Sequence, residues 1–186
     1  MTDAQSRPVA GILLAAGAGF RYGVPKALVD GWMAGAVDAL LDGGCEQVLV
    51  VLGAAAKEAR RLVPDGVDVV VAPDWTEGMG ASLRAALAAV ETSRADAALV
   101  HLVDLPDVGP DVVRRLARIA TPNVLARATY HGQAGHPVLL GRVHWRPVAA
   151  VAVGDEGARG YLRHREVEKV ECGDLAGGQD VDVRGP

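Results

Sequence analysis

The stretch VAGILLAAGAGFRYGVPK, from Val9 to Lys26, decides the fold of this 186-residue chain. Its first part, Val9 to Leu14, is a short continuous apolar run, which predicts a strand buried on both faces. Three glycines and a proline follow within eleven residues, so the strand must lead into a loop. Ligands bind beyond the carboxyl ends of the strands in an open α/β sheet. This loop is therefore the first place to look for a functional site.

The loop matches neither of the two common phosphate-loop motifs. Tyr22 stands where the dinucleotide fingerprint has its third glycine, and Gly23 is followed by Val-Pro-Lys instead of Lys-Ser/Thr. The glycines nevertheless let backbone N–H groups approach an anion, while Arg21 and Lys26 add two positive charges. Pro25 restricts the backbone just before Lys26. We predict a polyphosphate ligand; the alternative is a glycine-rich turn with solvated basic residues.

Strands and helices alternate along the rest of the chain. Further apolar runs predict strands at Val48 to Leu52, Val67 to Ala72, Ala97 to Val103, Val124 to Ala128 and Pro137 to Leu140. Helical stretches lie between them at Met33 to Leu41, Ala55 to Val63, Ser82 to Val90, Asp111 to Ile119, Arg142 to Val151 and Gly157 to Arg163. This alternation predicts an α/β fold with a mainly parallel sheet covered on both faces. Residues 123–141 are expected to hold antiparallel strands and a substrate loop.

No repeat, linker or low-complexity tract divides the chain, so we expect one domain over residues 1–186, with residues 1–7 as a flexible N-terminal tail. A hydrophobic content of 50% excludes disorder. A net charge of −4 and only seven aromatic residues argue against a nucleic-acid partner. There is neither an apolar run of about 20 residues nor an apolar N-terminal signal, which predicts no membrane association and a cytoplasmic location.

The segment from Leu14 to Lys26 resembles the signature of nucleotidyltransferases that transfer a nucleoside monophosphate from an NTP, specifically the molybdenum cofactor cytidylyltransferase branch. The resemblance extends from Val9 to Asp182. It implies a Rossmann-like nucleotidyltransferase fold, a three-layer αβα sandwich with a mixed sheet, Mg²⁺ as cofactor, and release of pyrophosphate. In that branch the pair Ala15-Ala16 goes with cytosine, whereas guanylyl-transferring relatives carry glycine after the first alanine.

The segment from Gly78 to Leu83 resembles the Gly-Met-x-x-Ser-Leu element that opens a helix in this branch. Gly78 and Gly80 permit close backbone approach, and free N–H groups at a helix start contact anionic or polar ligands. Ser82 is equally typical of a capping residue. With the first loop, the resemblance implies a nucleotide-binding set of Leu14, Ala15, Ala16, Gly17, Gly19, Arg21, Lys26, Gly78, Gly80 and Ser82.

Asp104 follows the most apolar predicted strand and resembles the strand-end Asp that binds magnesium beside the triphosphate in this family. A carboxylate facing a phosphate loop needs a cation to offset the repulsion. The alternative is a turn cap ahead of Pro106, a common role for Asp. Asp182 aligns with a second metal carboxylate of related enzymes, although the Thr-Pro-Glu-Asp run and terminal helix that commonly follow are missing. We expect Asp107 to serve a turn or cap.

Two residues of the C-terminal half remain. Arg159 lies in a segment that resembles the cofactor side of the family's site, where its guanidinium is suited to a substrate phosphate; the alternative is a plain helix start. His136, before Pro137, is expected to be a turn or core residue instead of a general base. After Leu28, the family's stretch with a further glycine and proline is shortened to residues 29–33.

The resemblance thus implies transfer of CMP from CTP to the phosphate of molybdopterin or molybdenum cofactor, with Arg21, Lys26 and Asp104 as catalytic residues. A molybdoenzyme that receives the product is an expected partner. Such transfers are catalysed by positioning and charge stabilisation, with no protein nucleophile. Two alternatives stay open. One is another NTP or another phosphorylated acceptor, such as a sugar phosphate. The other is a catalytically weak carrier of the cofactor.

Overall fold

The run that opens the sequence forms strand β1, Val9–Ala15, at the centre of a seven-stranded sheet, and all seven of its residues are buried. This computed structural model describes residues 7–182 of the chain. Of the expected N-terminal tail, residues 1–6 lie outside the described part. Arg7 is described and pairs with Asp96, with 3.3 Å between the guanidinium and the carboxylate.

The sheet has the order β3-β2-β1-β4-β6-β5-β7, and only β6 runs antiparallel to its neighbours. The strands after β1 are β2 Gln47–Leu52, β3 Asp68–Val71, β4 Ala97–Leu102, β5 Leu125–Tyr130, β6 Gln133–Gly141 and β7 Glu168–Glu171. The predicted mainly parallel, mixed sheet is confirmed. The antiparallel hairpin of β5 and β6 falls in the region where antiparallel strands were expected.

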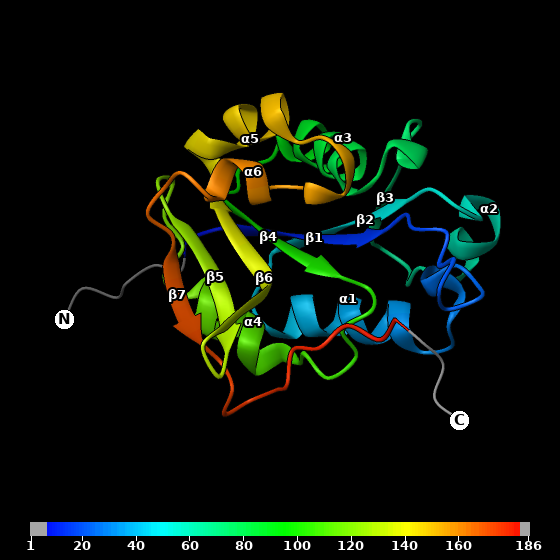
Figure 1. The fold of residues 1–186 in the computed structure, drawn as a ribbon, viewed down its shortest axis with the longest axis horizontal. Helices are drawn as coiled ribbons and strands as arrows, with labels where there is room; N and C mark the ends of the chain where they lie inside the picture. Colours follow the sequence, from blue (N-terminus) through cyan, green and yellow to red (C-terminus); the bar gives the residue numbers. More distant parts are fainter. Residues whose placement is uncertain (1–6, 183–186) are drawn as a thin grey trace.

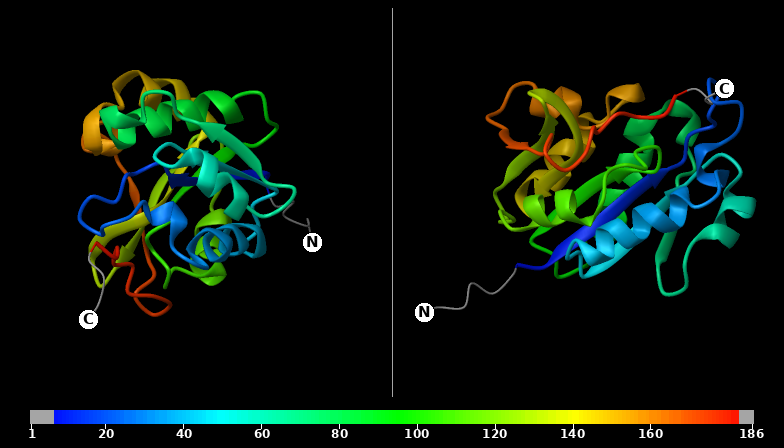
Figure 2. Two further views of the ribbon diagram at one scale, coloured as in Figure 1. Left: turned by 90° about the vertical axis from the view of Figure 1, so that its right-hand side faces the viewer. Right: turned by 90° about the horizontal axis from the view of Figure 1, so that it is seen from below.

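Helices cover both faces of the sheet, as expected for three layers (Figure 1, Figure 2). On one face lie α1 Trp32–Asp42 and α4 Pro110–Ala117, and on the other lie α3 Met79–Val90, α5 Trp145–Val151 and α6 Arg159–Leu162. The short α2, Ala56–Ala59, stands at the end of the molecule where β1 and β2 finish. Single turns of 3-10 helix complete the chain: η1 Lys26–Leu28, η2 Arg60–Leu62, η3 Trp75–Glu77, η4 Arg142–His144 and η5 Gly154–Glu156.

Alternation along the strands builds a separate core on each face. In β1, Leu13 joins the core under α1 and α4, with Leu40 and Leu116, whereas Ile12 joins the core under α3, α5 and α6, with Leu87. Successive side chains of a strand point to opposite faces, so one buried strand supplies both cores. Because β1 must supply apolar side chains to both cores, its sequence is a continuous apolar run, as predicted for a strand covered on both faces.

Two predicted helices differ from the observed ones, and one strand was not predicted. The expected helix from Ala55 to Val63 is the four-residue α2 followed by the 3-10 turn η2, and α3 begins at Met79 instead of Ser82. Strand β7 was missed, because its sequence Glu-Lys-Val-Glu carries a single apolar residue. Within residues 7–182, no helix is long and apolar enough to cross a membrane.

Candidate functional site

The order in which successive strands are added to the sheet reverses between β1 and β4. The chain moves from β1 outward to β2 and β3, and then returns to place β4 on the other side of β1. Ligands bind at such a switch point in α/β sheets, beyond the carboxyl ends of the strands. The loops that follow β1 and β4 therefore meet at one place, and the predicted catalytic residues lie on these two loops.

The loop after β1 folds back on itself. Gly19 has φ +63°, and a Cβ added to it would stand 1.9 Å from the carbonyl oxygen of Val24. The N–H of Gly23 donates to the carbonyl oxygen of Gly19 at 2.8 Å. Only glycine fits at position 19, because a side chain there would collide with the returning backbone. This close approach leads the chain through Pro25 into η1, which begins at Lys26.

Lys26 joins the loop after β1 to two carboxylates. Its Nζ donates to Asp104 Oδ2 at 2.6 Å and to Asp182 Oδ1 at 2.8 Å, and the side chains of Lys26 and Asp104 are only 15% and 16% exposed. Arg21 reaches the same cluster, since its guanidinium donates to Asp182 Oδ2 at 3.0 Å, although Arg21 itself is largely exposed. The structure thus brings together four residues predicted for the site.

These contacts change the ionisation of the cluster. Burial lowers the pKa of Lys26, but the hydrogen bonds and charges of Asp104 and Asp182 outweigh it, so the pKa is raised above its ordinary value. The hydrogen bond from Lys26 lowers the pKa of Asp182. Lys26 is therefore an ammonium and Asp182 a carboxylate at neutral pH, which gives the cluster the charges needed to bind phosphates and cations.

A C-terminal strap, residues 173–182, carries Asp182 to the site. The N–H groups of Gly177 and Gly178 donate to Asp107 Oδ2 at 2.8 and 3.1 Å, and the N–H of Val181 donates to the carbonyl oxygen of Asp104 at 3.0 Å. Asp107, expected to serve a turn or cap, thus anchors this strap. The strap crosses from the β7 edge to the end of β4, near the C-terminal end of the described chain (Figure 1).

The strap adds a third carboxylate. One carboxylate oxygen from each of Asp104, Asp180 and Asp182 lies within 4.8 Å of the others. Oxygen ligands of this kind suit a hard divalent cation such as Mg²⁺ or Mn²⁺. The donor set fits a metal, with one condition: the Lys26 ammonium already contacts two of the three carboxylates, so a cation must share or displace these contacts. Asp180 was not among the predicted ligands.

The remaining nucleotide-binding candidates of β1 lie in the body of the fold. Leu14, Ala15 and Ala16 are buried. The carbonyl oxygen of Leu14 accepts from the N–H of Val103, and that of Ala16 accepts from the N–H of Ala54. These three residues therefore pack beneath the loop and support it from within the fold. Gly17, by contrast, has open space where a Cβ would be.

Gly78, Gly80 and Ser82 lie at the start of α3, and the structure gives a packing reason for both glycines. A Cβ on Gly78 would stand 2.5 Å from Asp155 Oδ1, and a Cβ on Gly80 would stand 2.7 Å from the backbone of Ala152 and Val153. The close approach expected of a ligand is made here by the segment between α5 and η5. Ser82 is buried inside α3 and caps nothing, because the N-cap residue is Gly78.

Arg159 does not join the carboxylate cluster. It is the first residue of α6 and acts electrostatically on Arg127 of β5 and on His136 of β6, two residues with no predicted role in binding. Arg127 carries no local signal in the sequence, because one arginine on a strand is typical of a solvated face.

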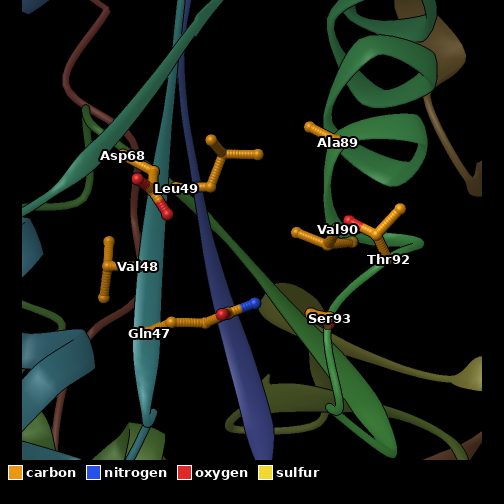
Figure 3. Close-up of a pocket in the computed structure, with 8 residues that line it drawn as sticks. All are labelled: Gln47, Val48, Leu49, Asp68, Ala89, Val90, Thr92 and Ser93. Carbon is orange, nitrogen blue, oxygen red and sulfur yellow. The ribbon is translucent and has the colours of Figure 1, made fainter.

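A pocket of about 150 Å³ lies elsewhere (Figure 3). It is formed where β2 and β3 begin and where α3 ends, and its lining is Gln47, Val48, Leu49, Asp68, Ala89, Val90, Thr92 and Ser93. The residues from β2 and β3 lie at the amino ends of these strands, whereas Lys26 lies beyond the carboxyl end of β1. The pocket contains none of the predicted site residues.

Comparison with known proteins places the chain among nucleotide-transferring folds. Residues 11–170 match the model of the MobA-like NTP transferase domain. The nicotine blue oxidoreductase of Paenarthrobacter nicotinovorans is 36% identical over 198 residues, an alignment that covers 98% of this chain and 96% of that protein.

Solved structures agree with this match. The Rv0371c protein of Mycobacterium tuberculosis H37Rv superposes with a TM-score of 0.82 at 31% identity, over 96% of this chain and 94% of that one. A second structure of Rv0371c, in complex with manganese, has a TM-score of 0.74 at 28% identity over 89% and 88% of the two chains. A nucleotidyl transferase from Methanothermobacter thermautotroptrophicus has a TM-score of 0.76 at 23% identity over 89% and 87%, which shows a shared fold.

Proposed function

This chain belongs to the MobA-like NTP transferase domain family, and from that premise we propose that it transfers CMP from CTP to the phosphate of molybdopterin or molybdenum cofactor. The observation that carries the transferase part is the cluster at the β1–β4 switch point, in which Lys26 contacts Asp104 and Asp182, and Arg21 contacts Asp182. The choice of CTP rests on Ala15-Ala16, and the choice of acceptor rests on the resemblance of the whole chain to the cytidylyltransferase branch.

In the proposed reaction an oxygen of the acceptor phosphate attacks the α-phosphorus of CTP. The bond from that phosphorus to the oxygen bridging to the β-phosphate breaks, and pyrophosphate leaves with that oxygen. The acceptor phosphate is already ionised near neutral pH, so no protein nucleophile is needed. Lys26 and Arg21 orient the triphosphate and offset the charge that builds on the leaving pyrophosphate.

Asp104, Asp180 and Asp182 are the residues that would hold a divalent cation. Such a cation supplies charge neutralisation and Lewis-acid polarisation at the phosphates. The manganese complex of Rv0371c supports a divalent metal in this family, and the oxygen donor set supports Mg²⁺ or Mn²⁺ here. In the chain itself, Lys26 keeps Asp104 and Asp182 in place before any ligand enters.

The test supplies each of the four NTPs with Mg²⁺ and molybdopterin and measures pyrophosphate release. We expect release with CTP, and we expect CTP to raise the melting temperature more than the other three nucleotides do. A larger effect of GTP would overturn the cytidylyl assignment. Nucleotide binding without pyrophosphate release would favour the carrier, and release only with a sugar phosphate would identify a different acceptor.

The 36% identity to nicotine blue oxidoreductase favours a second candidate, an oxidoreductase acting on nicotine blue or a related compound. The loop argues against it, because Tyr22 replaces the third glycine of the dinucleotide fingerprint. Incubation with nicotine blue and a reduced nicotinamide nucleotide, followed by absorbance, separates the two candidates. Substrate bleaching that persists in Lys26→Met, where nucleotidyl transfer must fail, would establish the second activity.

A further inference from the structure

Arg127 is a half-buried arginine without a carboxylate partner. It lies on β5, opposite Val138 of β6, and one of its terminal nitrogens donates to the carbonyl oxygen of Gly135 at 3.1 Å. Its Nε is buried and has no hydrogen-bond partner among residues 7–182. A buried guanidinium N–H without an acceptor is costly, and a bound anion is one way to supply the acceptor.

Helix α6 lies over this part of the sheet. Tyr161 and Leu162 of α6 pack in the same core as Leu125 of β5 and Val138 of β6. Side chains of β5 alternate between the two faces, and Leu125 shares its parity with Arg127, so Arg127 faces the α6 side. Figure 1 shows α6 beside the end of β6. Arg159, the first residue of α6, is thereby brought to the side of the sheet that carries Arg127.

The charges of the two arginines act on each other and on His136. Burial, and then the charge of Arg159, lower the pKa of Arg127. Burial lowers the pKa of His136 to about 4, with contributions from Arg127 and Arg159, so the imidazole is neutral at pH 7. Within residues 7–182 no carboxylate pairs with either arginine, and the nearby Glu156 pairs with Arg163 instead. The cluster therefore carries two positive charges without a carboxylate partner, one on the half-buried Arg127 and one on the exposed Arg159.

We infer that Arg127, His136 and Arg159 form a second anion subsite, which takes the phosphate monoester of the acceptor while the loop after β1 takes the triphosphate. The inference rests on the proposed function for the identity of its ligand. Two guanidiniums offer the forked donors that suit a phosphate, and the unpartnered Nε of Arg127 gains an acceptor when an anion enters. A neutral His136 adds a hydrogen-bond donor without further repulsion. The subsite differs from the Lys26 cluster, whose positive charges are already paired with carboxylates.

The Nε–H group of Arg127 is a direct reporter of this subsite. We would follow its resonance in ¹⁵N–¹H spectra of the full chain during titration with inorganic phosphate, with and without saturating CTP and Mg²⁺. The resonance is assigned by triple-resonance experiments and checked by its loss in Arg127→Lys. Arg159→Gln removes one charge of the subsite, and Arg163→Gln is the matched control, because it removes the same charge four residues away.

We expect phosphate to shift the Arg127 resonance in the wild type and in Arg163→Gln at the same concentration, and to need about tenfold more in Arg159→Gln. The phosphate-induced shift should persist when CTP and Mg²⁺ are present, because the two ligands must be bound side by side for the reaction. An unshifted resonance, or equal titrations in Arg159→Gln and the wild type, would overturn the subsite. Displacement of phosphate by CTP would also overturn the proposal, since the arginines would then bind the nucleotide.

Steady-state kinetics provides the second readout. Arg159→Gln should raise KM for the acceptor about tenfold and leave KM for CTP unchanged, whereas Arg163→Gln should change neither. A rise in KM for CTP would contradict the division between the two sites. If the wild type binds no NTP, the proposed function fails, but the phosphate titration of Arg127 still decides whether the anion subsite exists.

Discussion

Lys26 contacts two of the three carboxylates that would hold a divalent cation, since its ammonium lies against both Asp104 and Asp182. In Lys26→Met the three carboxylates face one another with only Arg21 nearby. We expect the variant to melt at a lower temperature without metal and to gain more stability from Mn²⁺ than the wild type does. Each tenfold gain in affinity adds about 1.4 kcal/mol at saturating metal. Thermal melts with and without Mn²⁺ measure this difference.

Lys57→Met is the matched control, because Lys57 is an exposed residue of α2 and its loss changes the net charge equally. It should melt like the wild type and respond to Mn²⁺ in the same way. In the transfer assay, Lys26→Met should lose about a hundredfold or more in turnover, as for a lost preorganised charge. An identical Mn²⁺ response in both variants would mean that the cation does not compete with Lys26.

Two histidines, the buried His101 and the half-buried His136, predict how the free energy of unfolding depends on pH. Burial lowers the pKa of His101 to about 3 and that of His136 to about 4. In the unfolded chain both titrate near pH 6.5, so below that pH the unfolded state binds protons that the folded state does not. Stability must therefore fall as the pH drops from about 6.5 to 4, by up to roughly 1.4 kcal/mol per pH unit for each histidine.

Urea unfolding at pH 7 and pH 5 tests this dependence. His101→Leu should lose close to half of the acid sensitivity and remain folded, since neither ring nitrogen of His101 has a partner within residues 7–182. His164→Gln, at an exposed position, should keep the wild-type dependence. A wild-type pH dependence in His101→Leu would show that His101 is protonated equally in both states.

Residues of the site differ in how readily the sequence reveals them. Arg21 and Lys26 follow an entirely apolar strand, and Asp104 follows one that is apolar except for His101, so their charge and position already indicate a site. Asp182 was expected only from the family resemblance, and Asp180 was named only as a further residue to test if Asp104 proved structural, because nothing local shows that the C-terminal segment crosses the sheet. Arg127 was missed for the same reason: its neighbour Arg159 is 32 positions away along the chain, and only the packing of α6 brings their charges together.

At the scale of elements, the start of α3 packs so closely against the backbone of residues 152–153 that it has room only for glycine at position 80. Gly80→Ala should destabilise the protein by about 1–3 kcal/mol, because a Cβ would stand 2.7 Å from the backbone of residues 152–153. Gly35→Ala, at an exposed position of α1 with open space around it, should instead stabilise by about 0.5–1 kcal/mol. Urea unfolding of both variants measures the contrast.

If Gly80→Ala is as stable as the wild type, the glycine is kept for a ligand and not for packing. In that case the alanine variant should still lose affinity for CTP in a thermal-shift titration, because the added methyl group would then meet the nucleotide.

The elements that hydrophobic pattern alone predicts are those buried on both faces. β1, β2 and β4 are apolar apart from Gln47 and His101, and they were found within one or two residues of their ends. β7 was missed. It lies at a sheet edge, where Glu168, Lys169 and Glu171 are exposed to solvent and break the apolar pattern. Pairing with β5 makes it a strand, and pairing is a property of the assembled sheet.

At the scale of the whole molecule, Asp107 connects the strap to the end of β4. Asp107→Ala removes the acceptor of the Gly177 and Gly178 N–H groups, so Asp180 and Asp182 are held less firmly beside Asp104. We expect a roughly five- to tenfold weaker affinity for Mn²⁺, equivalent to about 1–1.4 kcal/mol for the lost hydrogen bonds. The fold itself should be retained, because Asp107 is exposed.

Calorimetric titration with Mn²⁺ tests this effect. Asp111→Ala is the control, since Asp111 is an exposed carboxylate nearby that pairs with Arg114 and does not touch the strap. Equal Mn²⁺ affinities of the two variants would show that the strap stays in place without its anchor.

The order of the strands also leaves the sheet with two very different ends. One end is β3, four residues long and next to the prolines at 64 and 73, and the other is β7, with charged side chains at three of its four positions. The β7 border discourages two sheets from joining edge to edge, because an incoming chain would have to desolvate its charges. The β3 border carries a single charged residue and an exposed Val71, and only its shortness limits pairing, so any association between sheets at high concentration is expected to begin at β3.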